Sequence, residues 1–543
     1  MTYVIAKGCC NDASCISVCP VDCIRPRPGD PEFMTAEQLY IDPSTCIDCS
    51  ACVTACPVSA IYDENDMPEE FDLFKQINAD YFEKSPLDIS HPARKKRRSL
   101  TEQQPVLRVA IVGAGASGCY AADELARIAG VEVSVFDRRP VPFGLVRGGV
   151  APDHHKTKAV ADQFEKTLRR PNVTSYFNVD VGIQVTLDEL LEFHHAVVFA
   201  VGATSDKTLG IPGEALEGSY SARQFVAWYN GDSSAADLPV DLSGQRVVVV
   251  GNGNVSMDVA RILAAPVETF EPTDMADHAL QALRHSAVRE VVVVARRGPV
   301  DAAHTFSELW QLTQLEGVDV VTDIAEIDHD VGRGDGDGQF GSERKLAMNT
   351  AFAQNPGDDS RRKISLRYYL TPEAIGGDGS VESMTFRSSV TGELETFQTG
   401  LILRAIGYRA EPIRGVPFDP VRGTIRNIAG RVTTEGAESP IHGLYCTGWA
   451  KRGPTGVIGT NKVDSQQTVA ALCEDFESGN LTDPARLNDD VATFMNEKQP
   501  DLVSFAGWQR IDAAERERGR ISTVPRTRSK LISVDALLAA SRL

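Results

Sequence analysis

The sequence lacks the features of a membrane protein or a nucleic-acid-binding protein. No run of about 18 uncharged apolar residues occurs in its 543 residues, and the N-terminus, MTYVIAKGCC, has no charged region followed by an apolar one. Basic residues are outnumbered, with 55 Lys and Arg against 75 Asp and Glu for a net charge of -20. We therefore expect a cytoplasmic protein with no membrane insertion, no nucleic-acid partner and a preference for basic partners.

Cysteine is nearly absent from most of the chain. Of 12 cysteines, only Cys119, Cys446 and Cys473 lie beyond residue 56, and the rest crowd into the first tenth of the sequence. Such crowding in a chain without a secretory signal favours metal sites over disulfides. The length predicts about three domains, of which the cysteine-rich block is one.

The second cysteine run has the spacing of an iron-sulfur motif. It reads Cys46-Ile-Asp-Cys49-Ser-Ala-Cys52-Val-Thr-Ala-Cys56-Pro57, which matches C-x2-C-x2-C-x3-C-P. The first run reads Cys9-Cys10-Asn-Asp12-Ala-Ser-Cys15-Ile-Ser-Val-Cys19-Pro20, with Asp12 where the middle cysteine would stand. Residues 1 to about 70 thus resemble the two-cluster bacterial ferredoxins, and a zinc site or a disulfide knot is the less favoured interpretation.

The resemblance to ferredoxins implies two groups of ligands. One [4Fe-4S] cluster would be held by Cys19, Cys46, Cys49 and Cys52, and a second cluster by Cys9, Cys15 and Cys56. The second cluster would be [3Fe-4S], or [4Fe-4S] with Asp12 or Cys10 as the fourth ligand. Cys23 has no assigned role. Residues 1–75 carry 4 Lys and Arg against 13 Asp and Glu, so this block should dock on basic surfaces, including one on the same chain.

The remainder of the chain alternates short apolar strands with amphipathic stretches, which is typical of parallel βαβ units. We expect a ferredoxin-like α+β domain at 1–75, a linker at 76–105 and two Rossmann-like α/β domains. The first Rossmann-like domain would comprise 106–205 and 401–543, and the second 206–400. The basic run at 94–98 is interpreted as a solvated connector. The polar, Gly-rich segment 330–395 predicts mobile loops around an antiparallel excursion.

A first glycine-rich turn follows the strand at 107–112. It reads Gly113-Ala-Gly115-Ala116-Ser-Gly118, and the next strand, 131–136, ends in Asp137. The glycines allow a tight turn and a close approach to a pyrophosphate, and a carboxylate in this place binds ribose hydroxyls. The pattern predicts a dinucleotide site.

A second turn reads Gly251-Asn252-Gly253-Asn254-Val255-Ser256, with serine in place of the third glycine. The strand after it, 291–295, ends in Arg296 and Arg297 rather than in a carboxylate. Two guanidinium groups in this place suit a 2′-phosphate, which favours NADP(H) over NAD(H). The natural assignment is FAD in the first turn and NADP in the second.

Residues from 106 onward also resemble the adrenodoxin-reductase type of ferredoxin-NADP reductase. The resemblance rests on the segments at 143–155, 199–204, 211–214, 251–261 and 405–408, and above all on Gly448-Trp449-Ala-Lys-Arg-Gly-Pro-Thr-Gly456-Val457-Ile458. It implies that Trp449 lies against the flavin ring and that the amides of residues 456–458 meet the polar edge of the flavin. The resemblance places further residues by the cofactors: Leu145 and Val181 by FAD, and Asn252, Gly253, Asn254, Val255, Arg296, Arg297 and Glu308 by NADP.

Two further residues, Lys207 and His154, are candidates for roles at the nucleotide sites. Lys207 stands where that family commonly has arginine, which keeps a point charge but loses the bidentate contact with phosphate. His154, in the segment near the flavin, is a candidate for proton handling, and its alternative role is structural.

The sequence thus predicts an oxidoreductase: a ferredoxin-NADP reductase with its own ferredoxin domain, passing electrons between NADPH, FAD, iron-sulfur clusters and an acceptor protein such as a ferredoxin or a cytochrome P450. The direction of electron flow stays open. One alternative is the NADPH-oxidising small subunit of a glutamate-synthase-like complex, which the Trp449 segment disfavours. Another is a redox-sensing iron-sulfur flavoprotein.

Overall fold

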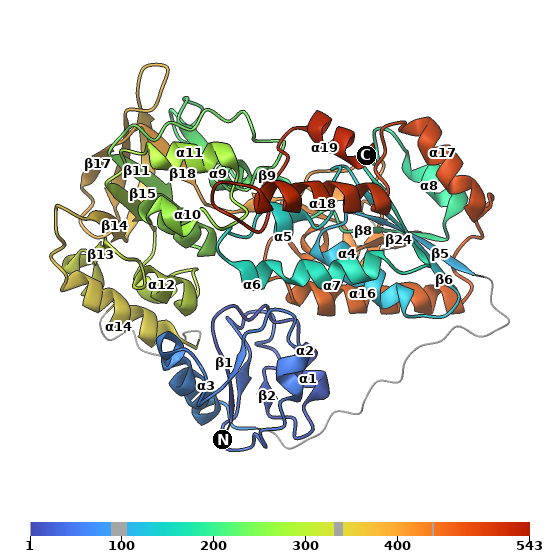
Figure 1. Cartoon of the computed structure of the whole chain (residues 1–543), viewed down its shortest axis with the longest axis horizontal. Coiled ribbons are helices and arrows are strands. Elements are labelled where there is room, and N and C mark those ends of the chain that lie inside the picture. The colour runs from blue at the N-terminus through green and yellow to red at the C-terminus, as the bar shows by residue number, and fades with distance from the viewer. Residues whose placement is uncertain (1, 88–105, 331–339, 437–438, 543) are drawn as a thin grey trace.

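The computed structural model describes residues 2–87, 106–330, 340–436 and 439–542. The basic run at 94–98 lies outside these residues. Three units are visible in Figure 1: a small N-terminal unit lies beneath two larger ones, which stand side by side. No helix in the described part of the chain is both long enough and apolar enough to cross a lipid bilayer.

The N-terminal unit is built from two small antiparallel pairs. Strand β1 (Tyr3–Ile5) pairs with β4 (Ile61–Asp63), and β2 (Ile24–Arg25) pairs with β3 (Tyr40–Ile41). The short helices α1 (Ser14–Val18) and α2 (Ala51–Ala55) lie within the two cysteine runs.

Helix α3 (Leu73–Lys84) is tied to this unit by the buried side chain of Asn78, which accepts hydrogen bonds from the amides of Ile5 and Ile41. The N-terminal unit therefore extends to Lys84. The boundary predicted at residue 75 falls inside α3, because no local pattern shows that this helix packs back on the strands.

The first nucleotide-binding unit is a seven-stranded sheet with the order β22-β23-β24-β8-β5-β6-β7. Strands β24, β8, β5, β6 and β7 are parallel, whereas β22 and β23 pair antiparallel; the apolar runs predicted all the parallel strands here except β7. The bounds are β5 Leu107–Val112, β6 Val131–Asp137, β7 Val173–Phe177, β8 Ala196–Phe199, β22 Asn427–Ile428, β23 Arg431–Thr433 and β24 Pro440–Cys446. Helices α4 (Ala116–Ala126) and α16 (Thr460–Glu477) pack against each other on one face of the sheet.

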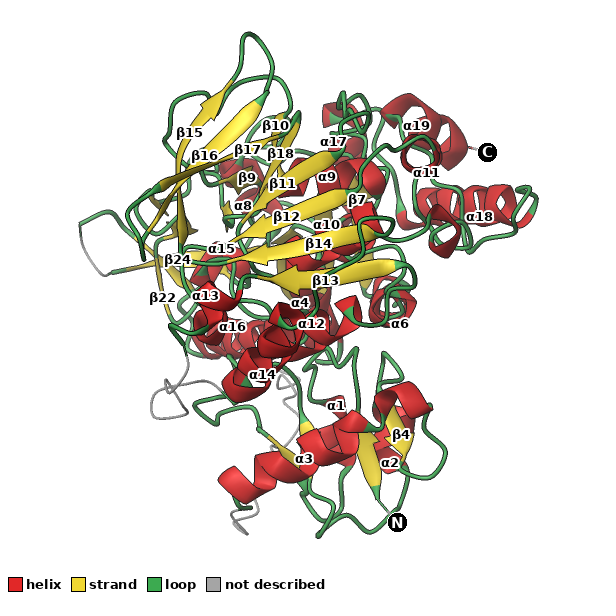
Figure 2. Cartoon of the chain, turned by 90° about the vertical axis from the view of Figure 1, so that its left-hand side faces the viewer, coloured by secondary structure: helices red, strands yellow, loops and turns green. Residues whose placement is uncertain are grey.

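The second nucleotide-binding unit is an all-parallel sheet with the order β10-β18-β11-β12-β14-β13, seen in Figure 2. Its strands are β10 Ser219–Ser221, β11 Arg246–Val250, β12 Glu290–Val294, β13 Val318–Thr322, β14 Arg362–Arg367 and β18 Leu401–Arg404. Strand β18 pairs with both β10 and β11, so the second unit ends after Arg404 and not at residue 400. The chain passes between the two units twice, and these two passages pair as the antiparallel strands β9 (Ser205–Asp206) and β19 (Tyr408–Arg409).

The expectation of loops over 330–395 is wrong for much of the segment. Helix α14 (Ser342–Ala353) and the central strand β14 both lie within it, and only β15 (Leu370–Gly376), β16 (Ser383–Ser388) and β17 (Leu394–Gln398) form the antiparallel excursion. Residues 331–339 lie outside the described part. Strand β14 was missed because Ile364 and Leu366 stand among charged residues, and their burial comes from neighbouring strands.

The remaining elements complete the two larger units. The helices are α5 Gly144–Gly148, α6 His155–Lys158, α7 Val160–Leu168, α8 Leu187–Phe193, α9 Ala222–Tyr229, α10 Asn254–Ala264, α11 Asp277–Arg284, α12 Phe306–Leu312, α13 Ile324–Ile327, α15 Trp449–Arg452, α17 Val491–Lys498, α18 Phe505–Arg520 and α19 Val534–Arg542; the strands β20 Phe418–Asp419 and β21 Thr424–Ile425 form a small pair.

Candidate functional site

The first glycine-rich turn lies between β5 and α4. Gly113 has a φ of +109°, and a Cβ atom on Gly118 would lie 1.8 Å from the carbonyl oxygen of Gly113, so neither position accepts a side chain. A Cβ atom on Gly115 would meet no atom within 4 Å. The turn therefore needs two of its glycines for its own packing, while the third leaves open space where a pyrophosphate fits.

Asp137 stands at the end of β6, beside this turn. Its carboxylate accepts hydrogen bonds from the amide of Ala114 at 2.8 Å and the amide of Arg139 at 2.9 Å. Burial raises the pKa of this carboxyl. Asp137 thus fixes the turn to the neighbouring strand, and the remaining lone pairs of its oxygens can accept from ribose hydroxyls.

The Gly448-Trp449 segment lies over the start of α4. A Cβ atom on Gly448 would lie 1.9 Å from the hydroxyl oxygen of Ser117, and the amide of Gly448 donates to the buried Asp464 at 2.5 Å. The indole nitrogen of Trp449 donates to the carbonyl of Thr455 at 3.1 Å, and the Trp449 ring stacks on Tyr408 at 5.8 Å between centroids. These contacts fix the indole. Tyr408 belongs to the segment 405–408 that carries the family resemblance, whereas no motif pointed to Asp464.

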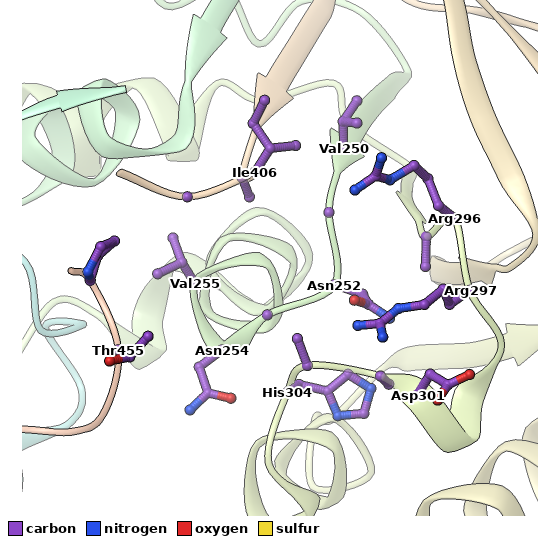
Figure 3. Close-up of a pocket in the computed structure, with 18 of the residues that line it drawn as sticks. Val250, Asn252, Asn254, Val255, Arg296, Arg297, Asp301, His304, Ile406 and Thr455 are labelled. Carbon is purple, nitrogen blue, oxygen red and sulfur yellow. The ribbon is translucent and has the colours of Figure 1, made fainter. Parts of the chain in front are cut away.

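A cleft of about 1390 Å³ runs from the second glycine-rich turn to Trp449. Figure 3 shows part of its wall. The predicted site residues that line it are Lys207, Asn252, Gly253, Asn254, Val255, Arg296, Arg297, Trp449, Gly456 and Val457. The fold thus joins both ends of the predicted nicotinamide site, although these residues lie up to 250 positions apart in sequence.

Arg296 and Arg297 are exposed, and both side chains reach into the cleft from the loop after β12 (Figure 3). In the described part of the chain, neither guanidinium lies within ion-pair distance of a carboxylate. Lys207 is also exposed on the wall. Cationic side chains that leave their charge uncompensated fit a phosphate-bearing ligand.

Other predicted residues lie elsewhere. Leu145, 41% exposed, is in α5, which starts beside the first turn, since a Cβ on Gly144 would be 3.1 Å from the Cα of Gly115. An exposed leucine there leaves an apolar surface for a ring system. Val181 is buried in the core of the first unit, and Ile458 packs on the core that includes Cys10.

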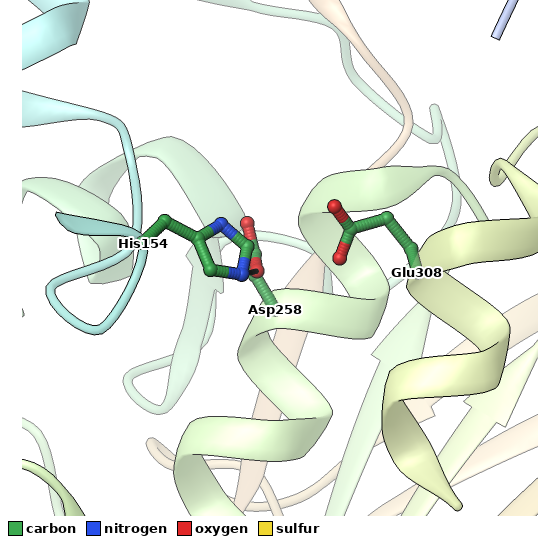
Figure 4. A group of neighbouring side chains, drawn as sticks. All are labelled: His154, Asp258 and Glu308. Atoms are coloured by element: carbon green, nitrogen blue, oxygen red, sulfur yellow. Dashed lines mark ion pairs between the residues drawn. The ribbon is translucent and has the colours of Figure 1, made fainter. Parts of the chain in front are cut away.

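His154 and Glu308 meet at the junction of the two larger units, with Asp258 between them (Figure 4). The Nε2 atom of His154 lies 3.8 Å from the Asp258 carboxylate and 3.1 Å from the amide oxygen of Gln311. Arg261, which is 2% exposed, pairs with Asp258 at 2.5 Å, so the group is a charge network rather than a free set of metal ligands. Among the residues lining the cleft, neither His154 nor Glu308 is present.

Four of the predicted iron ligands line one small apolar cavity in the N-terminal unit: Cys19, Cys46, Cys49 and Cys52. Cys23 lies in the same wall, with its sulfur 3.5 Å from that of Cys19. Burial raises the pKa of the Cys52 thiol to about 12, so four thiolates here would need a metal cation to compensate their charge. The donor set fits an iron-sulfur cluster.

The second group, Cys9, Cys15 and Cys56, faces the larger units. Burial raises the pKa of the Cys9 thiol to about 12, and nearby Cys56 contributes to this shift. Asp12 does not point freely at this group: its carboxylate accepts from the amide of Ser14 at 3.1 Å and pairs with Lys462 of α16 at 3.1 Å. Cys10 is buried and packs with the core of the first nucleotide-binding unit.

The cysteine loop contacts the reductase units directly. The amide of Gly459 donates to the carbonyl of Cys10 at 2.7 Å, and a Cβ atom on Gly459 would lie 2.1 Å from the amide nitrogen of Asp12. On the other side, Glu37 pairs with the buried Lys345 at 2.8 Å, and Phe71 and Phe74 pack on Trp310. Two lysines of the larger units, Lys345 and Lys462, thus pair with carboxylates of the acidic N-terminal unit at this contact.

Known protein families match both the N-terminal unit and the nucleotide-binding part of the chain. Residues 107–328 match the family of pyridine nucleotide-disulphide oxidoreductases, although Cys119 is the only cysteine in that range, and residues 39–62 match the 4Fe-4S binding domain. A probable ferredoxin/ferredoxin-NADP reductase of Mycobacterium tuberculosis is 46% identical over all of this chain and 95% of its own length.

Relatives without a counterpart of the N-terminal unit also match. The mitochondrial NADPH:adrenodoxin oxidoreductase of Arabidopsis thaliana is 37% identical over 80% of this chain and 95% of its own. The structure of Mycobacterium tuberculosis FprA in complex with NADPH is 40% identical, with a TM-score of 0.75 over 81% of this chain and all of that one. The two-nucleotide fold, the cysteine-lined cavity and the full-length relatives agree: this chain belongs to the family of ferredoxin-NADP reductases with a fused ferredoxin domain, and it is an oxidoreductase that transfers electrons.

Proposed function

We propose that this chain moves electrons between NADPH and an acceptor protein by way of FAD and two iron-sulfur clusters. When bound, FAD exchanges a hydride with the nicotinamide and single electrons with a cluster. The residues of the chain bind these groups, hold them in order and keep water away. The contact between Gly459 and Cys10 carries the proposal, because it joins the predicted flavin segment 456–458 to the cysteine loop.

The nicotinamide nucleotide would occupy the cleft. Arg296 and Arg297 would bind the 2′-phosphate, while the backbone of residues 252–255 at the start of α10 would meet the pyrophosphate. Trp449 would lie at the far end, by the reacting ring. The similarity to FprA, whose structure is described in complex with NADPH, supports this assignment.

The first nucleotide site would bind FAD. Gly115 leaves room for the pyrophosphate, Asp137 faces the ribose, and Leu145 offers an apolar surface. The turn between Trp449 and Ile458 connects this site with the cleft, since Trp449, Gly456 and Val457 line the cleft. One segment of chain would therefore meet both nucleotides.

The cluster near the flavin would be three-iron. Its three thiolate ligands would be Cys9, Cys15 and Cys56, and the Asp12 carboxylate is engaged by Ser14 and Lys462. The Cys10 side chain packs on the reductase core instead of joining the group. Three available thiolates match a [3Fe-4S] cluster, whereas Cys19, Cys46, Cys49 and Cys52 match a [4Fe-4S] cluster.

The two clusters held by these groups of ligands would pass electrons one after the other. The Cys9 group borders the flavin segment, and the other group includes the exposed Cys49, which an acceptor protein can approach. This arrangement favours ferredoxin-NADP reductase over a redox sensor, which needs no path from a nucleotide to an exposed cluster. The Trp449 segment supports the same branch over the glutamate-synthase-like alternative.

Anaerobic titration of the full chain with NADPH tests the proposal. The absorbance of FAD should bleach, and electron paramagnetic resonance should report one three-iron and one four-iron cluster in the same preparation. The proposal falls if NADPH reduces the flavin while both clusters stay oxidised with a redox mediator present and no electron acceptor, or if the protein contains zinc and no acid-labile sulfide.

Substitution at the contact with α16 tests the order of the groups. Lys462→Met should slow NADPH-dependent reduction of a protein acceptor about fivefold to tenfold, because Asp12 loses a charge partner at a partly buried contact. Reduction of ferricyanide, which takes electrons at the flavin, should remain unchanged. Lys462→Arg should restore most of the rate, whereas equal losses with both acceptors would contradict the proposed order.

A further inference from the structure

The cleft has a wall that belongs to neither nucleotide-binding unit. Among the residues lining it are Met34, Thr35, Ala36 and Glu37, which belong to the N-terminal ferredoxin unit. Met34 and Thr35 are exposed on this wall. They face the same space as Asn254 and Arg297. The structural match to FprA covers all of the FprA chain but only 81% of this one.

Glu37 fastens this wall to the second nucleotide-binding unit. One of its carboxylate oxygens lies 2.8 Å from the ammonium of Lys345, and the other accepts from the amide of Phe306 at 2.7 Å. Lys345 is 2% exposed, so its charge would be costly without this partner. Phe306 begins α12, and Thr305, just before it, donates its amide to the side chain of Asn254 at 2.8 Å. Glu37 is thus linked to the second glycine-rich turn through two adjacent residues, Phe306 and Thr305.

The wall is also connected to the cysteine loop. The side-chain amide of Asn11 donates to the carbonyl of Ala36 at 2.8 Å, and the thiol of Cys9 lies 3.3 Å from the Asn11 side-chain oxygen. Asn11 is fully buried. A displacement of residues 34–37 therefore cannot occur without disturbing Asn11, which touches a predicted iron ligand.

We propose that the ferredoxin unit forms part of the NADP(H) site, with residues 34–37 closing the cleft opposite the start of α10. This inference rests on the proposed assignment of the cleft to NADP(H). A nucleotide phosphate in the cleft then lies within reach of charges placed on the ferredoxin wall. By linkage, a nucleotide that contacts both units favours the docked position of the ferredoxin unit, and docking tightens nucleotide binding by the same factor.

Charge substitutions on the wall give effects of opposite sign. Thr35→Lys should lower the dissociation constant of NADP+ about threefold to tenfold, and Thr35→Glu should raise it by a similar factor, because one charge changes near several phosphate oxygens. Both effects should shrink at 0.5 M salt, about the range where exposed charges are strongly screened. The readouts are NADP+ titration of the flavin absorbance in the full holoenzyme and the KM for NADPH with ferricyanide.

Thr54 supplies the matched control. It is an exposed threonine of the same unit, on α2, and it does not line the cleft. Thr54→Lys and Thr54→Glu carry the same net charges, and they should change the dissociation constant less than about twofold, since only long-range screened forces act. If the Thr35 and Thr54 pairs give the same constants, the ferredoxin wall is not part of the site. If the unaltered chain fails to bind NADP+, the assignment of the cleft itself is wrong.

Discussion

The two glycine-rich turns look alike in sequence and differ in how they are finished. At the first, Gly118 packs against Gly113, and Asp137 turns its carboxylate onto the amides of the turn. At the second, Ser256 replaces the third glycine, and Arg296 and Arg297 stand exposed in an open cleft. At the first turn the charged carboxylate of Asp137 is engaged by the chain's own amides, whereas beside the second turn the two guanidinium groups are free to bind a ligand. This difference suits a resident cofactor at the first turn and an exchanging substrate at the second.

The largest expected effect of a substitution separates the third positions of the two turns. Gly118→Ala should abolish FAD retention and lower the melting temperature, because its Cβ would collide with a backbone carbonyl that cannot move aside. Ser256→Ala should change both quantities little, since the buried hydroxyl of Ser256 has no hydrogen-bond partner in the described structure. The measurements are the ratio of flavin to protein absorbance and calorimetry. Equal loss in both variants would show that the two turns are packed alike.

The next effect concerns the arginines. Arg297→Ala should raise the KM for NADPH about tenfold to a hundredfold and leave the KM for NADH unchanged, because only the 2′-phosphate loses a bidentate partner. Arg296→Ala serves as the paired variant on the same loop. Steady-state reduction of ferricyanide with each nucleotide checks the result. A parallel rise for both nucleotides would mean that the arginines do not read the 2′-phosphate.

Acid should weaken both units through one buried histidine each. Burial lowers the pKa of His304, beside the cleft, to about 3, and that of His194, beneath the first sheet, to about 4. Both values lie below the value of about 6.5 in an unfolded chain, so the unfolded state binds more protons and the free energy of unfolding falls as pH drops below about 6.5.

Each histidine contributes at most about 1.4 kcal/mol per pH unit of this loss. His304→Asn should flatten the pH dependence of the melting temperature down to about pH 3, whereas His194→Asn should flatten it only to about pH 4. Calorimetry across pH 3 to 7 measures both slopes. An unchanged slope in either variant would contradict the neutral, buried state of that histidine.

The smallest effect concerns Lys207, which lines the cleft with a single exposed ammonium. Lys207→Ala should raise the KM for NADPH about threefold, as expected for one solvent-screened charge. Lys207→Arg should leave the constant equal or lower, because a guanidinium can contact two phosphate oxygens at once. A loss as large as that of Arg297→Ala would place Lys207 on the 2′-phosphate as well.

Local sequence patterns predicted most of the fold. The apolar runs predicted most of the parallel strands, and the resemblance to ferredoxins grouped the four thiols that line one cavity. Two elements were misjudged: β14 was expected to be a loop, and β18, whose apolar run did predict a strand, was assigned to the first unit although it pairs inside the second sheet. Their burial is supplied by partners far along the chain, which no window of sequence contains.

The sequence by itself determined the two glycine-rich turns, the crowding of the cysteines into one block and the acidic charge of the N-terminal unit, because each depends on residue type and spacing. Only the tertiary structure decided that Asp12 pairs with Lys462, that Gly459 must be glycine to admit the cysteine loop, and that residues 34–37 close the nucleotide cleft. These contacts join positions about 270 to 450 residues apart, where the fold, and not the local pattern, sets the distance.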